Sequence, residues 1–217
     1  MMVYDKKAVE EKRQGKVPYD YYRSIFKDLD PNRIQENTGC IYNSEENELI
    51  VEVMGKKAIV KFPSGYIYNE DYSEMNNYSI KILVIRYLIN AKAVEPFNKD
   101  ITYRDVPGGN VYYPNFYGRC IARLARTFAN DLVRFEGACK RIGGERVSLG
   151  DIAYKIEFMH NVFITFILWK GDEEFPASAQ ILFDGNISFY FDAEDLAVVG
   201  DVAIDILKKL ASTDKVI

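Results

Sequence analysis

The densest group of acidic side chains in the sequence lies just after the apolar run 162–169. The run is followed by Asp172, Glu173 and Glu174, and the next apolar segment ends at Asp184. Several carboxylate oxygens within reach of one another suit Mg²⁺ or Ca²⁺, which makes Asp172, Glu174 and Asp184 candidate metal ligands. Two close carboxylates also shift each other's pKa for acid–base work. The alternative is a solvated acidic turn that blunts the edge of a sheet.

A second polar group consists of arginines around the glycine-rich loop 107–110. The candidate residues for binding an anionic ligand are Arg104, Asp105, Arg119, Arg123 and Arg126. On a helix the last three arginines fall within about 60° of arc, and such a stripe beside a glycine loop can bind phosphate or carboxylate. The loop is neither a Walker motif nor a dinucleotide-binding motif. The alternative is a solvated helical face whose arginines pair with Asp or Glu.

Histidine and cysteine are scarce. His160 is the only histidine and falls in an expected hairpin turn, while Cys40, Cys120 and Cys139 are widely spaced near apolar positions. The sequence has no Cys-x-x-Cys pair, so it contains no iron–sulfur, zinc or haem motif. Isolated free cysteines at such positions usually pack as small hydrophobic residues.

Composition narrows the class of protein and its partners. The net charge of −4 gives no global positive field for nucleic acid, and no apolar run approaches the length that spans a membrane. The first residues lack the apolar stretch of a signal peptide, so we expect a cytoplasmic protein. The 16 Tyr and 13 Phe residues could line a pocket or interface, but a β-rich core is the simpler explanation.

The elements that must position these side chains follow from hydrophobic periodicity. Alternating apolar residues predict a hairpin around Gly55, with a third strand at residues 66–68. A second set of strands is expected at residues 152–158, 162–169, 179–183 and 187–191. The uninterrupted run 162–169 is typical of a central strand covered on both faces.

Helices are expected between and after these strands. Their predicted spans are residues 19–29, a short helix from Asp30-Pro31 to Gly39, a helix capped by Ser79, residues 115–127, residues 131–142 and a C-terminal helix that begins with an Asp192/Asp195 capping box. Strands in runs with helices grouped between them predict an α+β fold with a largely antiparallel sheet. The length suits a single domain, residues 1–217, in which residues 1–29 form a loosely attached helical segment.

The connection between residues 169 and 179 is too short for a parallel crossover. The strands 162–169 and 179–183 should therefore pair antiparallel, with residues 173–175 at the tip of the connection. This pairing places Asp184 at the far end from Asp172, which argues against a metal site that contains both.

Seven short motifs are distributed over most of the chain: Asp30-Pro31 with Thr38-Gly39, residues 104–109, Gly143-Gly144, Gly150-Asp151, residues 171–175, residues 181–184 and residues 194–196. Together they resemble the domain-of-unknown-function family 3786 of anaerobic bacteria and archaea. The resemblance implies a similar fold and an anaerobic, cytoplasmic setting, and it implies no reaction. Some relatives with an attached cysteine-rich segment are described as iron–sulfur proteins, and this chain lacks such a segment.

Three functions remain open at this point. The first is a non-catalytic accessory domain that binds a small ligand or a protein partner. The second is a metal-assisted enzyme that uses Asp172, Glu174 and Asp184, with Arg104 or Arg119 orienting an anionic substrate. The third is an iron–sulfur carrier, which requires the three cysteines to converge.

Overall fold

The computed structural model describes residues 10–212, which divide into two compact units with the boundary between Ala93 and Val94. The predicted α+β class, with antiparallel sheets and a C-terminal helix, is confirmed. The single domain of residues 1–217 stays a prediction. We call residues 10–93 unit 1 and residues 94–212 unit 2.

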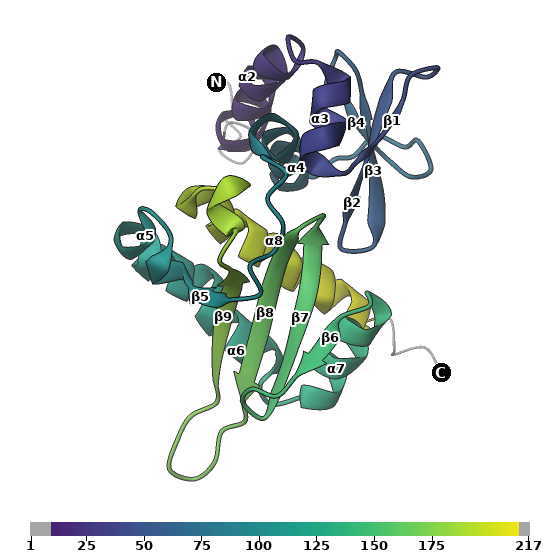
Figure 1. Ribbon diagram of the computed structural model, residues 1–217. Helices are drawn as coiled ribbons and strands as arrows, with labels where there is room; N and C mark the ends of the chain where they lie inside the picture. Colours follow the sequence, from purple (N-terminus) through teal and green to yellow (C-terminus); the bar gives the residue numbers. More distant parts are fainter. Residues whose placement is uncertain (1–9, 213–217) are drawn as a thin grey trace, which may run out of the picture. The chain divides into compact units, whose positions relative to one another are not determined.

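Unit 1 combines helices with a four-stranded meander (Figure 1). Its elements are η1 (Lys12–Lys16), α2 (Val17–Phe26), α3 (Pro31–Thr38), β1 (Ile41–Asn43), β2 (Glu48–Val53), β3 (Lys56–Lys61), β4 (Ile67–Asn69) and α4 (Tyr78–Asn90). The strand order is β1-β2-β3-β4, and every neighbouring pair is antiparallel. The hairpin around Gly55 and the third strand are thus confirmed.

Side-chain capping explains where α3 and α4 begin. The Asp30 side chain accepts a hydrogen bond from the N–H of Asn32, as predicted for the start of α3. For α4 the prediction is wrong by two residues: Asn77 caps the helix through the N–H of Ile80, rather than Ser79. Asn77 has extended backbone geometry, which a capping residue requires, whereas Ser79 is already helical.

The N-terminal helix α2 is packed into unit 1. Tyr19 and Phe26 are buried, and α2 lies against α4. The Tyr19 hydroxyl donates to the carbonyl of Gly65. Of the segment 1–29 for which a loose attachment is predicted, residues 1–9 lie outside the described residues, and α2 contributes to the core of unit 1.

Unit 2 contains a five-stranded sheet and the remaining helices. Its elements are β5 (Asp100–Thr102), η2 (Tyr103–Asp105), α5 (Gly109–Phe116), η3 (Tyr117–Ile121), α6 (Ala122–Phe128), α7 (Leu132–Arg141), β6 (Glu145–Val147), β7 (Ile152–Met159), β8 (Val162–Trp169), β9 (Ser178–Asp184), η4 (Ile187–Phe189) and α8 (Ala193–Ser212). The strand order is β5-β9-β8-β7-β6, with β8 in the middle and all neighbours antiparallel.

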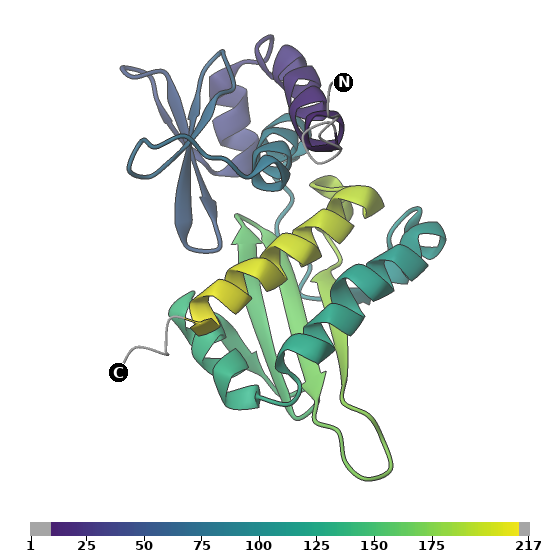
Figure 2. The same ribbon diagram turned by 180° about the vertical axis from the view of Figure 1, so that it is seen from behind.

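The central position of β8 and its antiparallel pairing with β9 confirm the prediction from the apolar run. Trp169 pairs with Ser178, and residues 170–177 form the connection between the two strands. The helices α5, α6, α7 and α8 lie on one face of the sheet (Figures 1 and 2). On the other face Ile167 is buried where the backbone at Gly150 passes close to its side chain, while Phe163 is half-buried.

The strand predicted at residues 187–191 is wrong. The chain turns after β9 into the short 3₁₀ helix η4, and β5 takes the place beside β9. The buried residues Ile187, Tyr190 and Phe191 have the spacing i, i+3, i+4, which is helical rather than alternating. Aromatic residues also fill the rest of the core, which supports the simpler explanation of their abundance.

Unit 2 contains one long helix made of three consecutive segments. The segments α5, η3 and α6 follow one another from Gly109 to Phe128, so the helix predicted at residues 115–127 begins earlier than expected. α7 forms as predicted, and its cap is Asp131. At the start of α8 the Asp192 side chain accepts a hydrogen bond from the N–H of Asp195, as predicted for that cap.

Candidate functional site

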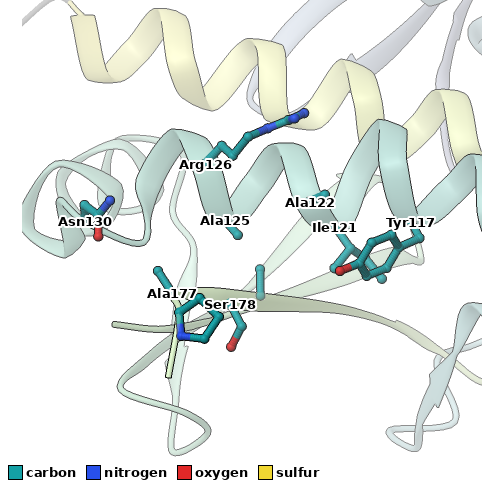
Figure 3. Close-up of a pocket in the computed structure, with 10 residues that line it drawn as sticks. Tyr117, Ile121, Ala122, Ala125, Arg126, Asn130, Ala177 and Ser178 are labelled. Carbon is teal, nitrogen blue, oxygen red and sulfur yellow. The ribbon is translucent and has the colours of Figure 1, made fainter. Parts of the chain in front are cut away.

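A pocket in unit 2 lies between the η3–α6 helix and the start of β9 (Figure 3). Its volume is about 360 Å³. It is lined by Tyr117, Ile121, Ala122, Ala125, Arg126, Asn130, Pro176, Ala177, Ser178 and Ala179. We call it the α6–β9 pocket.

The pocket exists because small side chains face each other across the two elements. On the helix, Ile121 and Ala122 each lie about one turn before Ala125, so all three can border the same gap. Across from them, Ala177 and Ala179 belong to the chain that enters β9. Alanine ends at Cβ, so this part of the helix and the strand leave a gap that larger residues would close.

Apart from Ser178, the middle of the pocket is lined by small or apolar side chains, and larger polar side chains stand at its two ends. In Figure 3 the Tyr117 ring lies at one end and Asn130 at the other. Arg126 also lines the pocket, but its side chain leaves the helix away from Ala177 and Ser178. Its guanidinium therefore does not point into the pocket. None of the ten lining residues is a carboxylate, histidine or cysteine.

The three arginines of the predicted stripe differ in their ion-pair partners. Arg119 Nε donates to Asp201 Oδ2 of α8 at 2.9 Å. Arg123 forms ion pairs with both Asp201 and Asp205. These two arginines therefore join the η3–α6 helix to α8. This is the alternative in which the arginines pair with Asp or Glu rather than with a ligand. Arg126 is exposed, and its guanidinium has no ion pair within residues 10–212.

Arg104 and Asp105 each have a local structural partner. The Arg104 guanidinium lies 3.7 Å from the centre of the Tyr113 ring. The carboxylate of Asp105 accepts hydrogen bonds from the hydroxyl and N–H of Thr102, at 2.7 and 2.8 Å. These bonds lower the pKa of Asp105. Asp105 thus forms a capping box with Thr102, and neither candidate lines the α6–β9 pocket.

The predicted metal ligands are not brought together. Asp172 and Glu174 lie in the connection 170–177, whereas Asp184 lies at the opposite end of β9. Asp172 Oδ1 accepts hydrogen bonds from the N–H groups of Phe175 and Glu174, and these bonds lower its pKa. In the described part of the chain, no three His, Cys, Asp or Glu side chains are placed to hold a metal ion.

The sequence matches the family described as "Domain of unknown function (DUF3786)" over residues 30–205. The chain belongs to the DUF3786 family. The matched region includes the α6–β9 pocket, all the predicted site residues and most of both units. No curated protein and no solved structure matches the sequence.

Within the DUF3786 region, Asp184 organises a buried polar cluster that sequence reasoning missed. Its Oδ1 accepts hydrogen bonds from the N–H of Phe97 at 2.7 Å and of Asn186 at 3.1 Å. The Asn186 side chain in turn donates to the carbonyls of Val94 and Asn161. The cluster therefore fastens the segment before β5 to the end of β9. The Asp-Gly-Asn sequence signals a turn here, and nothing local signals its distant partners.

The lone histidine and the cysteines occupy structural positions in this DUF3786 protein. His160 is exposed in the turn between β7 and β8, 3.6 Å from Glu157. All three cysteines are free and buried. Burial raises the pKa of each thiol, for Cys120 to about 12.

We expect these thiols to resist alkylation in the native protein. A thiol with a pKa near 12 is only about 0.01% thiolate at pH 8, and the thiolate is the reactive form. Iodoacetamide at pH 8, followed by intact-mass spectrometry, should leave native protein unmodified and label all three cysteines in guanidinium chloride. A thiol that is labelled rapidly in the native protein would contradict this burial.

None of the helices formed by residues 10–212 combines the length and hydrophobicity needed to cross a membrane.

Proposed function

We propose that this protein is a cytoplasmic accessory protein of anaerobic metabolism that binds a small ligand or a segment of a protein partner without transforming it. The proposed site is the α6–β9 pocket. The anaerobic and cytoplasmic setting is the one that the family resemblance implies. The observation that carries the proposal is the pocket itself: a floor made mostly of small apolar side chains, with Ser178 among them, and polar side chains at its two ends.

The size and lining of the pocket suit binding. Ligand sites in proteins are concave, mostly apolar and on the order of 300–1,000 Å³, with a few polar groups that orient the ligand. The α6–β9 pocket lies at the lower end of this range. It therefore suits a compact apolar group whose flanking atoms reach the Tyr117 hydroxyl and the Asn130 amide.

The same lining supports a role without catalysis. General acid–base catalysis uses His, Asp, Glu, Lys, Tyr or Cys near the reacting atoms. Of these types the pocket offers only Tyr117, half of whose surface is exposed to solvent. Among the candidates from the sequence, Arg123 pairs with α8 and Asp184 holds the segment before β5.

The experiment is a thermal-shift screen of the full chain with nucleotides, corrinoids, metal ions and acidic metabolites. A ligand present at a hundred times its Kd adds about 2.7 kcal/mol to the free energy of unfolding. We expect at least one class to raise the melting temperature of the wild type. Ala125→Phe, which fills the pocket, should abolish that rise, and Val111→Phe on the exposed face of α5 should keep it.

Two results would overturn the proposal. A shift that persists in Ala125→Phe would place the binding site elsewhere. If mass spectrometry of the reaction mixture detected conversion of any compound in the panel, the protein would be an enzyme. If no small molecule stabilises the wild type, the pocket serves a protein partner, which peptide selection against the full chain tests directly.

A further inference from the structure

One edge of β9 is open over part of its length. On one side β8 pairs with β9 from Ser178 to Phe183. On the other side β5 pairs only with residues 182–184. In the described structure, residues 178–181 therefore have a strand neighbour on one side only, and β9 continues past the end of the short β5 (Figure 1).

The hydrogen-bonding groups at this edge face outward. The N–H of Ile181 donates to Oε1 of the neighbouring Gln180 side chain, so this N–H points away from β8. In an antiparallel pair the residues that bond to a given neighbour alternate along the strand. The N–H and carbonyl of Ala179 consequently face the same open side, and no described loop or side chain outside the sheet accepts from that N–H.

The α6–β9 pocket lies directly beside this open edge. Residues 176–179 form one wall of the pocket and also begin the open part of β9. Ile181 and Phe183 face the helix layer, and Ala179 shares their face because side chains alternate along a strand. A strand added beside Ala179 would direct alternate side chains to this same face, and thus into the pocket.

We propose that this edge accepts an extended segment of a protein partner as an added strand. The segment lies beside residues 178–181, on the same edge of β9 that pairs with β5, and one of its apolar side chains enters the pocket. Main-chain hydrogen bonds supply affinity in this mode of recognition, and the pocket supplies specificity. Residues 178–181 offer about 13 Å of edge at the usual rise per residue, which suits a short segment. The inference rests on the proposed function and narrows its ligand to an extended peptide.

The same features also describe a protected edge. Short edge strands, a proline and side chains that cap backbone groups all limit unwanted pairing. Here Pro176 precedes the strand and Gln180 caps Ile181. Protection alone does not require a pocket beside the edge, and a protected edge binds no peptide with a defined register. The two alternatives therefore differ in a measurable way.

The experiment begins with selection of binders to the full chain from a displayed library of random eight-residue peptides. The best peptide is synthesised with a fluorophore, and its Kd is measured by fluorescence anisotropy. Ala179→Pro deletes the outward N–H and leaves the ladder with β8 intact, because proline is tolerated at an edge where its nitrogen faces out. We expect a loss of about tenfold or more, the value of roughly one hydrogen bond.

Val111→Phe on the exposed face of α5 is the control variant, because it alters neither the pocket nor the open edge of β9, and it should bind the peptide like the wild type. A second measurement avoids any effect on folding. The selected peptide is N-methylated at alternate residues in each of the two registers and tested against wild-type protein. One register should abolish binding and the other should preserve it, because only alternate N–H groups of an added strand face β9.

The inference is overturned if no peptide is selected, if Ala179→Pro binds as well as Val111→Phe, or if both methylation registers have equal effects. These failures are distinct from failure of the proposed function. A small-molecule shift that Ala125→Phe abolishes, together with no peptide binding, would keep the pocket and remove the strand. Peptide binding that is sensitive to Ala179→Pro but not to Ala125→Phe would keep the strand and remove the pocket.

Discussion

Asp184→Ala is expected to lower the free energy of unfolding by about 3 kcal/mol. The substitution leaves the N–H groups of Phe97 and Asn186 without their acceptor in a buried position. The buried Oδ2, which has no hydrogen-bond partner within residues 10–212, disappears as well and offsets part of the loss. Urea denaturation followed by circular dichroism measures the change.

The design of this experiment separates a structural role from a metal-binding role. Asp184→Asn keeps Oδ1 as an acceptor and should recover more than half of the lost stability. Asp172→Ala, in the exposed connection 170–177, should cost less than about 1 kcal/mol. The loss in Asp184→Ala should be the same in EDTA and in Mg²⁺. If EDTA destabilised the wild type to the level of Asp184→Ala, Asp184 would be a metal ligand.

Gly109→Ala is expected to destabilise the protein by about 3–5 kcal/mol. A Cβ at this position would overlap the carbonyl oxygen of Tyr103, far inside van der Waals contact. That carbonyl has little freedom to withdraw, because the Tyr103 ring stacks on Phe116 at 3.9 Å and its hydroxyl donates to Ala193. Denaturant unfolding and the melting temperature measure the effect.

Gly118→Ala is the matched control. Gly118 also lies in the long helix, but a Cβ added there would have no neighbouring atom within 4 Å outside the helix's own backbone. Alanine favours the helix over glycine by about 0.5–1 kcal/mol, so this variant should be slightly more stable than the wild type. Equal effects of the two substitutions would mean that the close approach at Gly109 is not what makes this glycine necessary.

The sequence predicts strands well where its pattern of apolar residues fits a strand and does not also fit a helix. Residues 162–169 are apolar almost throughout, and they form the central strand. The segment 187–191 contains both alternation and the helical spacing of Ile187, Tyr190 and Phe191. There the deciding fact is tertiary, because β5 occupies the edge of β9 that the predicted strand would need. No local pattern reports that β5, some 80 residues earlier, has this place.

The candidate site was less accessible from sequence for the same reason. Arg119, Arg123 and Asp184 are candidates because charged side chains often bind ligands. In the structure each of them instead bonds to a neighbouring segment of the fold. The pocket instead depends on Ala122 and Ala125, which are ordinary helix residues until residues 176–179 are placed against them. A gap between small side chains is a property of two segments together, so neither segment signals it alone.

The place of β5 in its sheet has a consequence for how the chain is made. In unit 1 each strand pairs with the one synthesised just before it. Residues 100–102, by contrast, pair with residues 182–184, which leave the ribosome about 80 residues later. At roughly 5–20 residues per second this delay is about 4–16 s. During nascent-chain growth, unit 1 can complete its sheet while the first strand of unit 2 still waits for its neighbour.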